Sequence, residues 1–488
     1  MNDKRYSELL KRKDIFHTSF VNLFFEFYDE YLIIFENLTD YNNISTKILK
    51  DRKFKESLIL MLIPDLSWER ALTNFRKNVC LKSVNDFNPS KDLTSLLQSL
   101  AVQCFMTDYV YEVSKEELSA LKVLKEKCKE DLSLLSIISC YIPLYNLVDE
   151  VPSIKDHIPR TKFERSLFKI QLKEPLEELK LSKTIEKIGV IQNNISEKVR
   201  NQYLENPYPK WRYVYFTPKQ SAVSLEVDLR ASIHTNYLNL NLSLIREPKI
   251  LIAGCGTGQQ VISASSYYNA KITAIDLSEN SLCYAKRKAQ EYGMNDVRFI
   301  HMDILNLKQL GEKFDLIECG GVLHHMENPK LGLLSLCDSL HTGGYMKLGL
   351  YSKIARSSIR KAHEIIKTLG IECTSEGIRE FRKKVFSGDL KELEDLTTMS
   401  IDFYGLSTCR DLCFHACEHQ FTIKEINSLL DECNLQFCGF NLPNFIKEEY
   451  LNYFPSDKSM TNLNNWELFE EENPHTFTQM YQFIVRSN

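Results

Sequence analysis

The feature that most constrains this chain is the alternation of short apolar runs with helical segments between residues 249 and 351. A short apolar run between turn residues is typical of a buried strand, whereas apolar residues spaced by three and four indicate a helix. Strands that alternate with helices form a parallel sheet with right-handed crossovers. The sequence therefore predicts an α/β domain, with strands at 249–253, 271–275, 297–301, 314–319 and 345–351.

A glycine-rich turn, AGCGTGQ at residues 253–259, directly follows the first of these strands. Glycine lets the backbone approach a ligand closely at the carboxyl end of a strand. Asp276 ends the next strand, where a carboxylate can accept hydrogen bonds from both hydroxyls of a ribose. Asp303 follows the third strand, where it can accept from the exocyclic amine of an adenine. Together these features predict an adenosine-binding site.

The spacing of the glycines distinguishes between two ligands that contain adenosine. A dinucleotide fingerprint needs glycine at its first, third and sixth positions, so that a pyrophosphate can lie on the helix N-terminus. Here glycines occupy positions 254, 256 and 258, and the sixth position is Gln259. S-adenosylmethionine (SAM) has no phosphate and needs the turn only for close passage of its methionine portion. The turn therefore favours SAM over NAD.

The order of the motifs resembles that of the class I SAM-dependent methyltransferases. The segments GCGTG, ITAIDLS, HMDI, FDLIECGGVLHHMENP and TGGYMKLGLY follow one another as they do in that family. The resemblance implies a Rossmann-like sheet, SAM as methyl donor and S-adenosylhomocysteine (SAH) as product. The chain departs from the family at Ile252, where class I enzymes commonly carry an acidic residue. The contact of that acid with the methionine portion is expected to come from elsewhere.

A closer resemblance is to bacterial methyltransferases with a helical N-terminal region, sometimes built of tetratricopeptide repeats, and an ENPYPKW-like segment before the cofactor domain. That segment lies at residues 205–211 here. Three further stretches match: LAVQCFMTDYVYEV at 100–113, GLYSKIAR at 349–356 and DFYGLSTCRDLCFHACEHQFT at 402–422. The closer resemblance therefore extends over most of the chain.

The resemblance to class I enzymes implies a set of cofactor-binding residues. The three glycines of the turn contact the methionine portion, Asp276 binds the ribose, and Asp303 lies beside the adenine. The residues expected to line the cofactor are Ala253, Gly254, Cys255, Gly256, Gly258, Gln259, Asp276, Leu277, Asp303, Ile304, Cys319, Gly320 and Leu323.

Methyl transfer is an in-line displacement, so the enzyme supplies alignment and a place for the proton of the nucleophile. His324 and His325 follow the fourth strand, where a base would be useful, although a structural role suits them equally. Tyr208 is a third candidate catalytic residue and a candidate wall of the pocket. Candidate substrate contacts are Asn206, Trp211, Tyr351, His415 and His419.

Two local patterns need an alternative interpretation. The NPYP letters at 206–209 resemble the NPPY motif of amino-group methyltransferases, but that motif follows the fourth strand, where ECGGVLHH lies here. Cys413, His415, Cys417 and His419 suggest a metal site. If one helix carries them, the cysteine pair and the histidine pair point in opposite directions, so we expect no metal.

The rest of the chain divides by its sequence texture. Apolar spacing of three and four predicts an all-helical domain at residues 1–187, and a Pro- and aromatic-rich stretch lies in a connecting segment at 188–248. The cofactor-binding domain at 249–352 is followed by a helical insertion at 353–425. Two last strands, within residues 426–488, complete the sheet.

Composition narrows the classes of function. Lys and Arg number 61 against 65 Asp and Glu, a formal net charge of −4, which disfavours general nucleic-acid binding. The 14 cysteines lack the spacing of a disulfide framework, and the first residues lack the apolar run of a signal peptide. No uncharged stretch matches the roughly 20 apolar residues of a membrane span. We therefore expect a cytoplasmic protein.

The sequence predicts an enzyme that transfers a methyl group from SAM to an acceptor. The helical domain is longer than the cofactor-binding core, which favours a protein or peptide acceptor. A small-molecule acceptor, with the extra helices as pocket walls, is the alternative; the departure at Ile252 also allows a cofactor-binding scaffold without turnover. The prolines and aromatic residues of ENPYPKW predict a wall or lid at the cofactor mouth.

Overall fold

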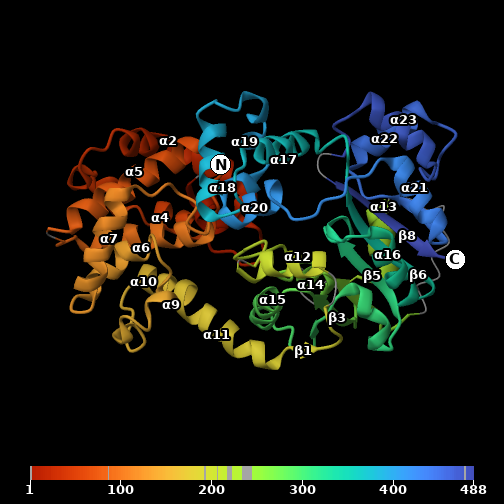
Figure 1. Ribbon diagram of the computed structural model, residues 1–488, viewed down its shortest axis with the longest axis horizontal. Coiled ribbons are helices and arrows are strands. Elements are labelled where there is room, and N and C mark those ends of the chain that lie inside the picture. The colour runs from red at the N-terminus through yellow and green to blue at the C-terminus, as the bar shows by residue number, and fades with distance from the viewer. Residues whose placement is uncertain are drawn as a thin grey trace. The chain divides into compact units, whose positions relative to one another are not determined.

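The chain forms two compact units, each assembled from discontinuous segments. The first unit contains residues 1–180, 210–215 and 362–414, and the second contains 181–209, 216–361 and 415–488. The structure is a computed structural model, coloured along the chain in Figure 1. It describes residues 3–85, 87–191, 194–205, 207–216, 223–233, 245–477 and 480–488. Within these residues, no helix combines the length and the apolar character needed to cross a membrane.

The N-terminal part of the first unit is all-helical, as predicted. Several of its helices begin after Asp or Ser caps whose side chains accept backbone N–H groups, for example Asp65 and Ser90. The helices are α1 (Asp3–Leu9), α2 (Val21–Glu36), α3 (Thr46–Lys50), α4 (Arg52–Leu60), α5 (Leu66–Ser83), α6 (Lys91–Met106), α7 (Lys115–Cys128), α8 (Leu135–Ile138), α9 (Leu144–Leu147), α10 (Lys162–Phe168) and α11 (Glu174–Leu181).

Aromatic side chains form the core of this unit. The Trp68 ring centroid lies 4.9 Å from that of Phe24 and 5.8 Å from that of Phe54, so α5, α2 and α4 meet at one buried point. Phe35 and Phe75 extend the same cluster and are also buried. The burial of large rings without voids is what holds such short helices together.

The predicted helical insertion forms α17 (Ser357–Leu369), α18 (Ser375–Phe386), α19 (Leu396–Met399) and α20 (Leu406–Cys413). Residues 362–414 belong to the first unit together with the N-terminal helices. A buried ion pair joins α18 to α5: Arg382 donates from Nη1 and Nη2 to the Glu69 carboxylate, at 3.1 and 2.6 Å. The insertion therefore completes the helical unit.

Three stretches matched by the closer resemblance meet at Asp108. One carboxylate oxygen of Asp108 accepts from the Ser407 hydroxyl of α20. The other accepts from Lys210 of the ENPYPKW segment. In addition, the Leu406 N–H donates to the Thr107 carbonyl at 3.0 Å. These distant parts of the sequence are thus joined within the first unit by hydrogen bonds to one turn.

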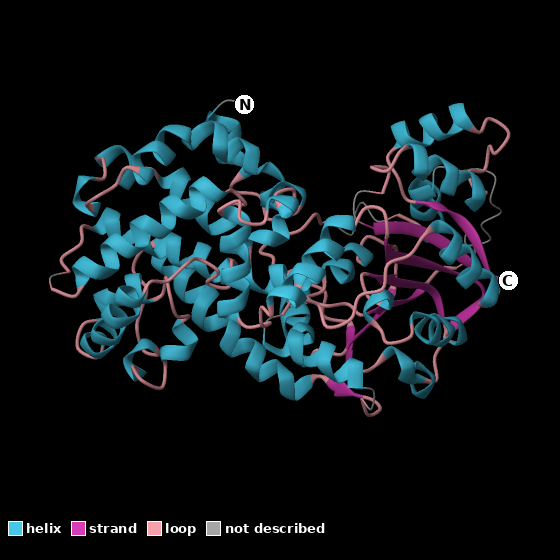
Figure 2. Ribbon diagram, turned by 45° about the horizontal axis from the view of Figure 1, so that its top comes forward, coloured by secondary structure: helices cyan, strands magenta, loops and turns pink. Residues whose placement is uncertain are grey.

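The second unit contains an eight-stranded sheet in the order β1-β4-β3-β2-β5-β6-β8-β7, drawn in magenta in Figure 2. Pairs from β1 to β6 are parallel, whereas β8 is antiparallel to both β6 and β7. This order confirms the predicted Rossmann-like sheet. The strands are β1 (Glu186–Lys187), β2 (Lys249–Ala253), β3 (Lys271–Asp276), β4 (Arg298–His301), β5 (Phe314–Gly320), β6 (Leu340–Tyr351), β7 (Leu435–Phe440) and β8 (Met480–Ser487).

Two strands differ from the prediction. The two-residue strand β1 was not expected, because its residues Glu186 and Lys187 are both exposed and carry no apolar signal. Strand β6 begins at Leu340, earlier than predicted, because Leu340 already pairs with Phe314; the register then shifts, and pairing resumes at Tyr345 after Gly343 and Gly344. Neither difference changes the order of the predicted strands.

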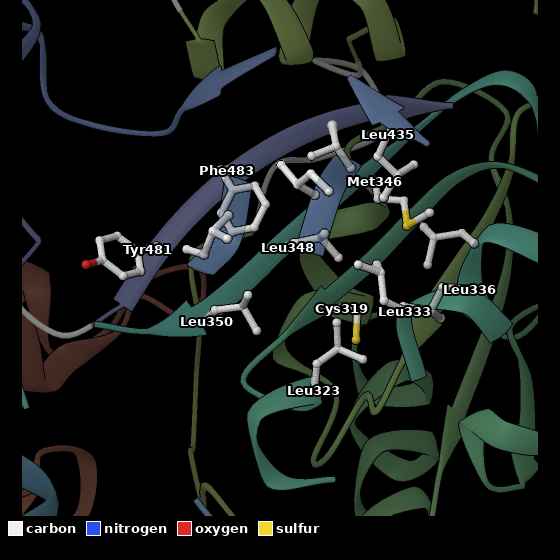
Figure 3. Packing of buried hydrophobic residues seen from close by; sticks show 14 of the residues in the cluster. Cys319, Leu323, Leu333, Leu336, Met346, Leu348, Leu350, Leu435, Tyr481 and Phe483 are labelled. Carbon is white, nitrogen blue, oxygen red and sulfur yellow. The ribbon is translucent and has the colours of Figure 1, made fainter. Parts of the chain in front are cut away.

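Helices cover the sheet. The helices of the unit are α12 (Asn194–Glu205), α13 (Leu225–Ile233), α14 (Gln259–Ala264), α15 (Glu279–Glu291), α16 (Pro329–Asp338), α21 (Ile423–Glu432), α22 (Asn444–Tyr453) and α23 (Leu463–Glu472). Leu333 and Leu336 of α16 pack against Leu348 of β6 and Phe483 of β8 in a continuous apolar cluster (Figure 3). Burial of this cluster holds the strands in register and so positions their carboxyl ends.

We predict that Glu69→Ala lowers the free energy of unfolding of the first unit by about 3–5 kcal/mol, because it leaves the Arg382 guanidinium buried without its carboxylate. Lys383→Ala is the matched control on the same helix, since its ion pair with Glu112 is 67% exposed on both sides and should contribute about 1 kcal/mol or less. Chemical denaturation followed by circular dichroism measures both. Equal losses would contradict the prediction.

Candidate functional site

The glycine turn after β2 is held by the end of β3. The N–H groups of Gly254 and Cys255 both donate to the Ile275 carbonyl at 2.9 Å. Gly254 has a φ of +71°, and a Cβ at this position would lie 2.4 Å from the Val322 side chain. Only glycine satisfies both the conformation and the close approach. The turn is therefore set against the ends of the neighbouring strands.

Asp276 is the predicted ribose ligand, and it lies at this turn. Its Oδ2 accepts from the Gly256 N–H at 2.8 Å, and its Oδ1 accepts from the Ser278 N–H at 2.7 Å. A carboxylate has about four lone-pair positions, so two remain for hydroxyl donors. Burial raises the pKa of Asp276 to about 6, and the backbone hydrogen bonds oppose that rise. The group is therefore ionised at neutral pH and titrates just below it.

Asp303 and Ile304 lie at the same edge of the sheet. The Met302 N–H donates to the Asp276 carbonyl at 3.1 Å, which brings the ends of β3 and β4 together. The Asp303 Oδ1 caps the following turn by accepting from the Leu305 N–H at 2.9 Å. The Leu277 carbonyl lies 2.9 Å from Nε2 of His301 and accepts a hydrogen bond from it. The structure thus gathers these four predicted cofactor residues at one edge.

The remaining predicted cofactor residues divide into two groups. The side chains of Ala253, Cys319 and Leu323 belong to the buried apolar cluster, so only their backbone atoms can face a ligand (Figure 3). Gly320 ends β5, and Gln259 begins α14 directly after Gly258. Gly320 therefore lies at the carboxyl end of the strand beside β2, and Gln259 lies at the start of the helix that follows the turn.

Part of the ENPYPKW segment lies against the glycine turn. The Thr257 hydroxyl donates to the Pro209 carbonyl at 2.6 Å, and a Cβ on Gly256 would lie 3.1 Å from the Tyr208 carbonyl oxygen. Asn206 lies outside the described residues. Trp211 is buried in the first unit, so the segment passes from one unit to the other after Pro209.

Four rings predicted as catalytic or substrate residues form two stacked pairs. The His324 ring centroid lies 3.7 Å from that of Tyr351, and the His325 centroid lies 3.6 Å from that of His415. The two pairs adjoin, because His324 and His325 are neighbours with centroids 4.4 Å apart. The short helical turn after β5, the end of β6 and the segment after α20 therefore meet at one point.

The backbone of Cys417 determines the tautomers of two of these rings. His325 Nδ1 lies 2.8 Å from the Cys417 carbonyl, which can only accept, so this nitrogen carries the proton. His415 Nδ1 lies 3.1 Å from the Cys417 N–H and accepts from it. The neutral His415 ring is therefore protonated at Nε2, which lies 3.2 Å from the Tyr203 hydroxyl. In neutral His325, Nε2 carries a lone pair and has no hydrogen-bond partner among the described residues.

Burial keeps this group of histidines neutral. It lowers the pKa of His324 and of His325 well below the usual value, and the nearby Arg356 charge acts in the same direction. Burial also lowers the pKa of His415 to about 4. His324 differs from His325 because both its ring nitrogens are buried without a partner in the described part of the chain. His325 is therefore the ring with both a fixed tautomer and an available lone pair.

The sequence reasoning missed three side chains of this group. Arg356 donates to both oxygens of Glu418, at 2.9 and 2.6 Å, and its guanidinium lies 3.6 Å from the Tyr351 ring centroid. Arg356 ends the GLYSKIAR stretch, which was the available signal. Tyr203 of α12 has no motif of its own, but its carbonyl accepts from the Ser278 hydroxyl at 3.2 Å, next to Asp276.

The expectation that one helix carries Cys413, His415, Cys417 and His419 is wrong, because α20 ends at Cys413. The residues after it are extended, and their backbone binds the histidine group instead: the His419 N–H donates to the His324 carbonyl at 2.7 Å. The Cys417 thiol donates to the Met326 carbonyl at 3.6 Å, and burial raises its pKa. The argument from opposite helix faces therefore does not apply to these four residues. The Cys417 thiol is protonated and donates its hydrogen bond to Met326.

Residues 250–344 match the family described as methyltransferase domain. An uncharacterised protein of Synechococcus sp. is 33% identical over 204 residues, which cover 40% of this chain and 48% of that protein. The mitochondrial ubiquinone biosynthesis O-methyltransferase of Schizosaccharomyces pombe is 26% identical over 186 residues, 37% of this chain and 63% of that enzyme. The match thus spans about half of the first relative and less than two thirds of the second.

A solved structure, PKMT2 from Rickettsia typhi in complex with AdoHcy, aligns with 57% of this chain and 55% of its own. It is 17% identical, with a TM-score of 0.43. The family match lies within the second unit and includes the glycine turn, Asp276, Asp303 and both histidines after β5. Residues 250–344 are thus similar to a methyltransferase domain and contain part of the site described above.

We predict that His325 is protonated at Nδ1 and His415 at Nε2 in the native protein at pH 6, because the Cys417 backbone accepts from one ring and donates to the other. Both rings should be neutral at this pH, since burial lowers both pKa values. Long-range ¹H–¹⁵N correlation spectra report tautomer and charge, with His325→Gln and His415→Gln to assign the signals. Free imidazole in the same tube serves as the protonated reference; two charged rings would contradict this geometry.

Proposed function

We propose that this chain is a SAM-dependent methyltransferase. The observation that carries the proposal is the Asp276 carboxylate, which is fixed by the Gly256 N–H at the glycine turn and keeps lone pairs for ribose hydroxyls. It lies in the part of the chain that matches a methyltransferase domain. SAM supplies an electrophilic methyl group on a sulfonium. The glycine turn, Asp276 and Asp303 would hold it at the carboxyl edge of the sheet.

The residues present fit such a cofactor. The turn offers backbone without side chains at positions 254, 256 and 258. Asp276 ends β3, and Asp303 follows the neighbouring strand β4, so one would accept from the ribose and the other from the base of an adenosine. Tyr208 and Pro209 lie against the same turn and would limit access of water to it. Each of these contacts belongs to the second unit.

His325 is the proposed proton acceptor. As a new bond forms between the acceptor atom and the methyl carbon, the carbon–sulfur bond breaks, and the proton of the acceptor needs a base. Nε2 of His325 has the lone pair for this task, because Nδ1 is protonated and donates to Cys417. Stacking on His415 holds the ring in place. His324 would support Tyr351 by stacking and would take no proton.

The acceptor is proposed to be a protein or peptide. The first unit has its own helical core of aromatic residues, which a fold that only encloses a metabolite does not need. The name of the fission-yeast relative instead indicates a small-molecule substrate for that enzyme, which keeps a small-molecule acceptor as the second candidate. A scaffold that binds cofactor without turnover is the third.

Asp276→Ala is expected to weaken binding of SAH about ten- to a hundredfold, because it removes the acceptor for the ribose hydroxyls. In the wild type, affinity should fall several-fold between pH 7.5 and pH 5.5. The sign follows from the pKa of about 6: the carboxylate becomes protonated as the pH falls through that value and loses its acceptor capacity. Isothermal titration calorimetry with SAH measures both effects.

Asp276→Asn is the control for the pH effect, since an amide does not titrate and its affinity should vary little over the same range. Binding of neither SAM nor SAH to the folded wild type would contradict the proposed function. A pH dependence that persists in Asp276→Asn would assign the titration to another group.

Incubation with tritiated-methyl SAM and cell lysate is expected to label the macromolecular fraction. His325→Gln should reduce the rate of labelling at least about a hundredfold, because it removes a general base. SAH affinity should stay within about twofold of wild type, since the base contacts the acceptor and not the adenosine. Scintillation counting of separated fractions measures the label.

Three other outcomes have distinct meanings. Label in the small-molecule fraction would contradict a protein acceptor and favour the second candidate. No label in either fraction, with intact SAH binding, would favour the scaffold. An equal loss of activity in His324→Gln and His325→Gln, at equal stability, would contradict the choice of His325 as the base.

A further inference from the structure

A cavity of about 300 Å³ lies on one face of the sheet in the second unit. Its floor is formed by residues of β5 and β6. Glu318 pairs with Lys347 there, and two residues further along the strands Gly320 pairs with Gly349. The two facing glycines carry no side chains of their own, and the Met480 sulfur approaches the sheet at Gly349, 2.5 Å from where a Cβ would lie. A Cβ on Gly320 would already lie 2.9 Å from Nε2 of Gln260 above it. A side chain at either glycine would therefore collide with Gln260 or Met480, which also line the cavity.

One end of the cavity adjoins the glycine turn. Gln260 is the second residue of α14, which begins directly after Gly258. Glu318 on β5 lies in register with Ile252 on β2, two residues before the first glycine of the turn. In parallel strands, residues in register project from the same face of the sheet. Glu318 thus places a carboxylate beside the position where class I enzymes commonly carry their acid and this chain carries isoleucine.

Acceptors at this end of the cavity lack donors. The Gln260 side-chain oxygen is buried and has no hydrogen-bond partner among the described residues. Glu318 Oε1 lies 3.1 Å from the Tyr267 hydroxyl, while its Oε2 has no donor in the described part of the chain. A buried acceptor without a partner costs free energy unless a ligand or water donates to it. The buried Gln260 oxygen therefore suits an N–H donor, and the second Glu318 oxygen can accept from the same group.

The charge around the cavity favours a cation. Lys347 Nζ is 2.5 Å from Asp228 Oδ2 and 3.7 Å from Glu318 Oε1, so one ammonium faces two carboxylates. Tyr267 does not add charge, because burial raises its pKa well above the usual value. Burial also raises the pKa of Glu318, and the nearby Lys347 ammonium opposes that rise. One further positive charge would balance the group.

We propose that Glu318 and Gln260 bind the α-ammonium of the methionine portion of SAM, in place of the acid that is absent at Ile252. The proposal rests on the proposed function, which supplies the ligand. The ammonium would donate to the free Glu318 oxygen and to the orphaned Gln260 oxygen. The amino-acid end would lie in the cavity that Gly320, Gly349, Gln260 and Met480 line.

The test compares two ligands that differ only in the ammonium. These are SAH and its deamino analogue, in which the amino group is replaced by hydrogen. Glu318→Gln is expected to weaken SAH binding about tenfold or more, since it removes a charged acceptor, and to leave the affinity for the analogue within about twofold. Gln260→Met should show the same selectivity with a smaller effect. Isothermal titration calorimetry at pH 7.5 gives all the affinities.

Glu312→Gln is the matched control, because it removes the same charge from the same unit at a half-exposed ion pair with Arg298. Its affinities for both ligands should equal those of the wild type. Thermal unfolding of each variant checks that Glu318→Gln, which keeps an acceptor for Tyr267, still folds. A folded Glu318→Gln protein with an altered SAH affinity is then a direct measure of the contact.

Several results would overturn the proposal. If Glu318→Gln binds SAH as tightly as the wild type, or loses SAH and the analogue equally, Glu318 does not contact the ammonium. If SAH binding is unchanged but methyl transfer falls, the cavity holds the acceptor instead. Failure of the wild type to bind SAH at all would be a failure of the proposed function, and the two failures are therefore distinguishable.

Discussion

The site depends on the hydrogen bonds that fasten the glycine turn to the end of β3. The Ile275 carbonyl accepts two N–H groups of the turn, and the Asp276 carboxylate accepts a third. These bonds fix the Asp276 carboxylate, which is the proposed ribose acceptor, and the backbone of the glycine turn relative to each other. Burial raises the pKa of Asp276 to about 6 and so makes it sensitive to mild acid, whereas the backbone hydrogen bonds that position the carboxylate oppose that rise. The adjoining cavity and the histidine group are positioned by the strands that carry this turn.

The histidine group shows how an extended backbone can set the chemistry of side chains. Cys417 offers its carbonyl to His325 and its N–H to His415, and so gives two stacked rings opposite tautomers. Arg356 forms an ion pair with Glu418, and its guanidinium stacks on the ring of Tyr351. From the sequence alone, His325 would be expected to titrate near neutral pH. Burial instead lowers its pKa well below the usual value.

Much of the fold was predictable because its signals are local. The apolar runs from β2 to β8 and the glycine turn can each be recognised within a few residues. The proposed role of Asp276 was predicted from its position at a strand end. Other features had no local signal. β1 is two exposed residues, Tyr203 lies on an ordinary helix, and α20 ends at Cys413, four residues before the backbone of Cys417 binds the histidines. The residue at which a helix ends depends on competing tertiary hydrogen bonds, and the spacing of apolar residues does not indicate those bonds.

The sequence by itself determined the α/β class and the helical character of both the N-terminal region and the insertion, and it suggested the proposed cofactor, because these depend on periodicity and on spacing within short segments. Only the tertiary structure decided which distant groups meet. It assigned residues 362–414 to the first unit, joined Asp108 to Ser407 and Lys210, and set Glu318 beside Ile252. The physical reason is that strand register and the pairing of buried charges are decided by the packing of whole elements, which no single segment encodes.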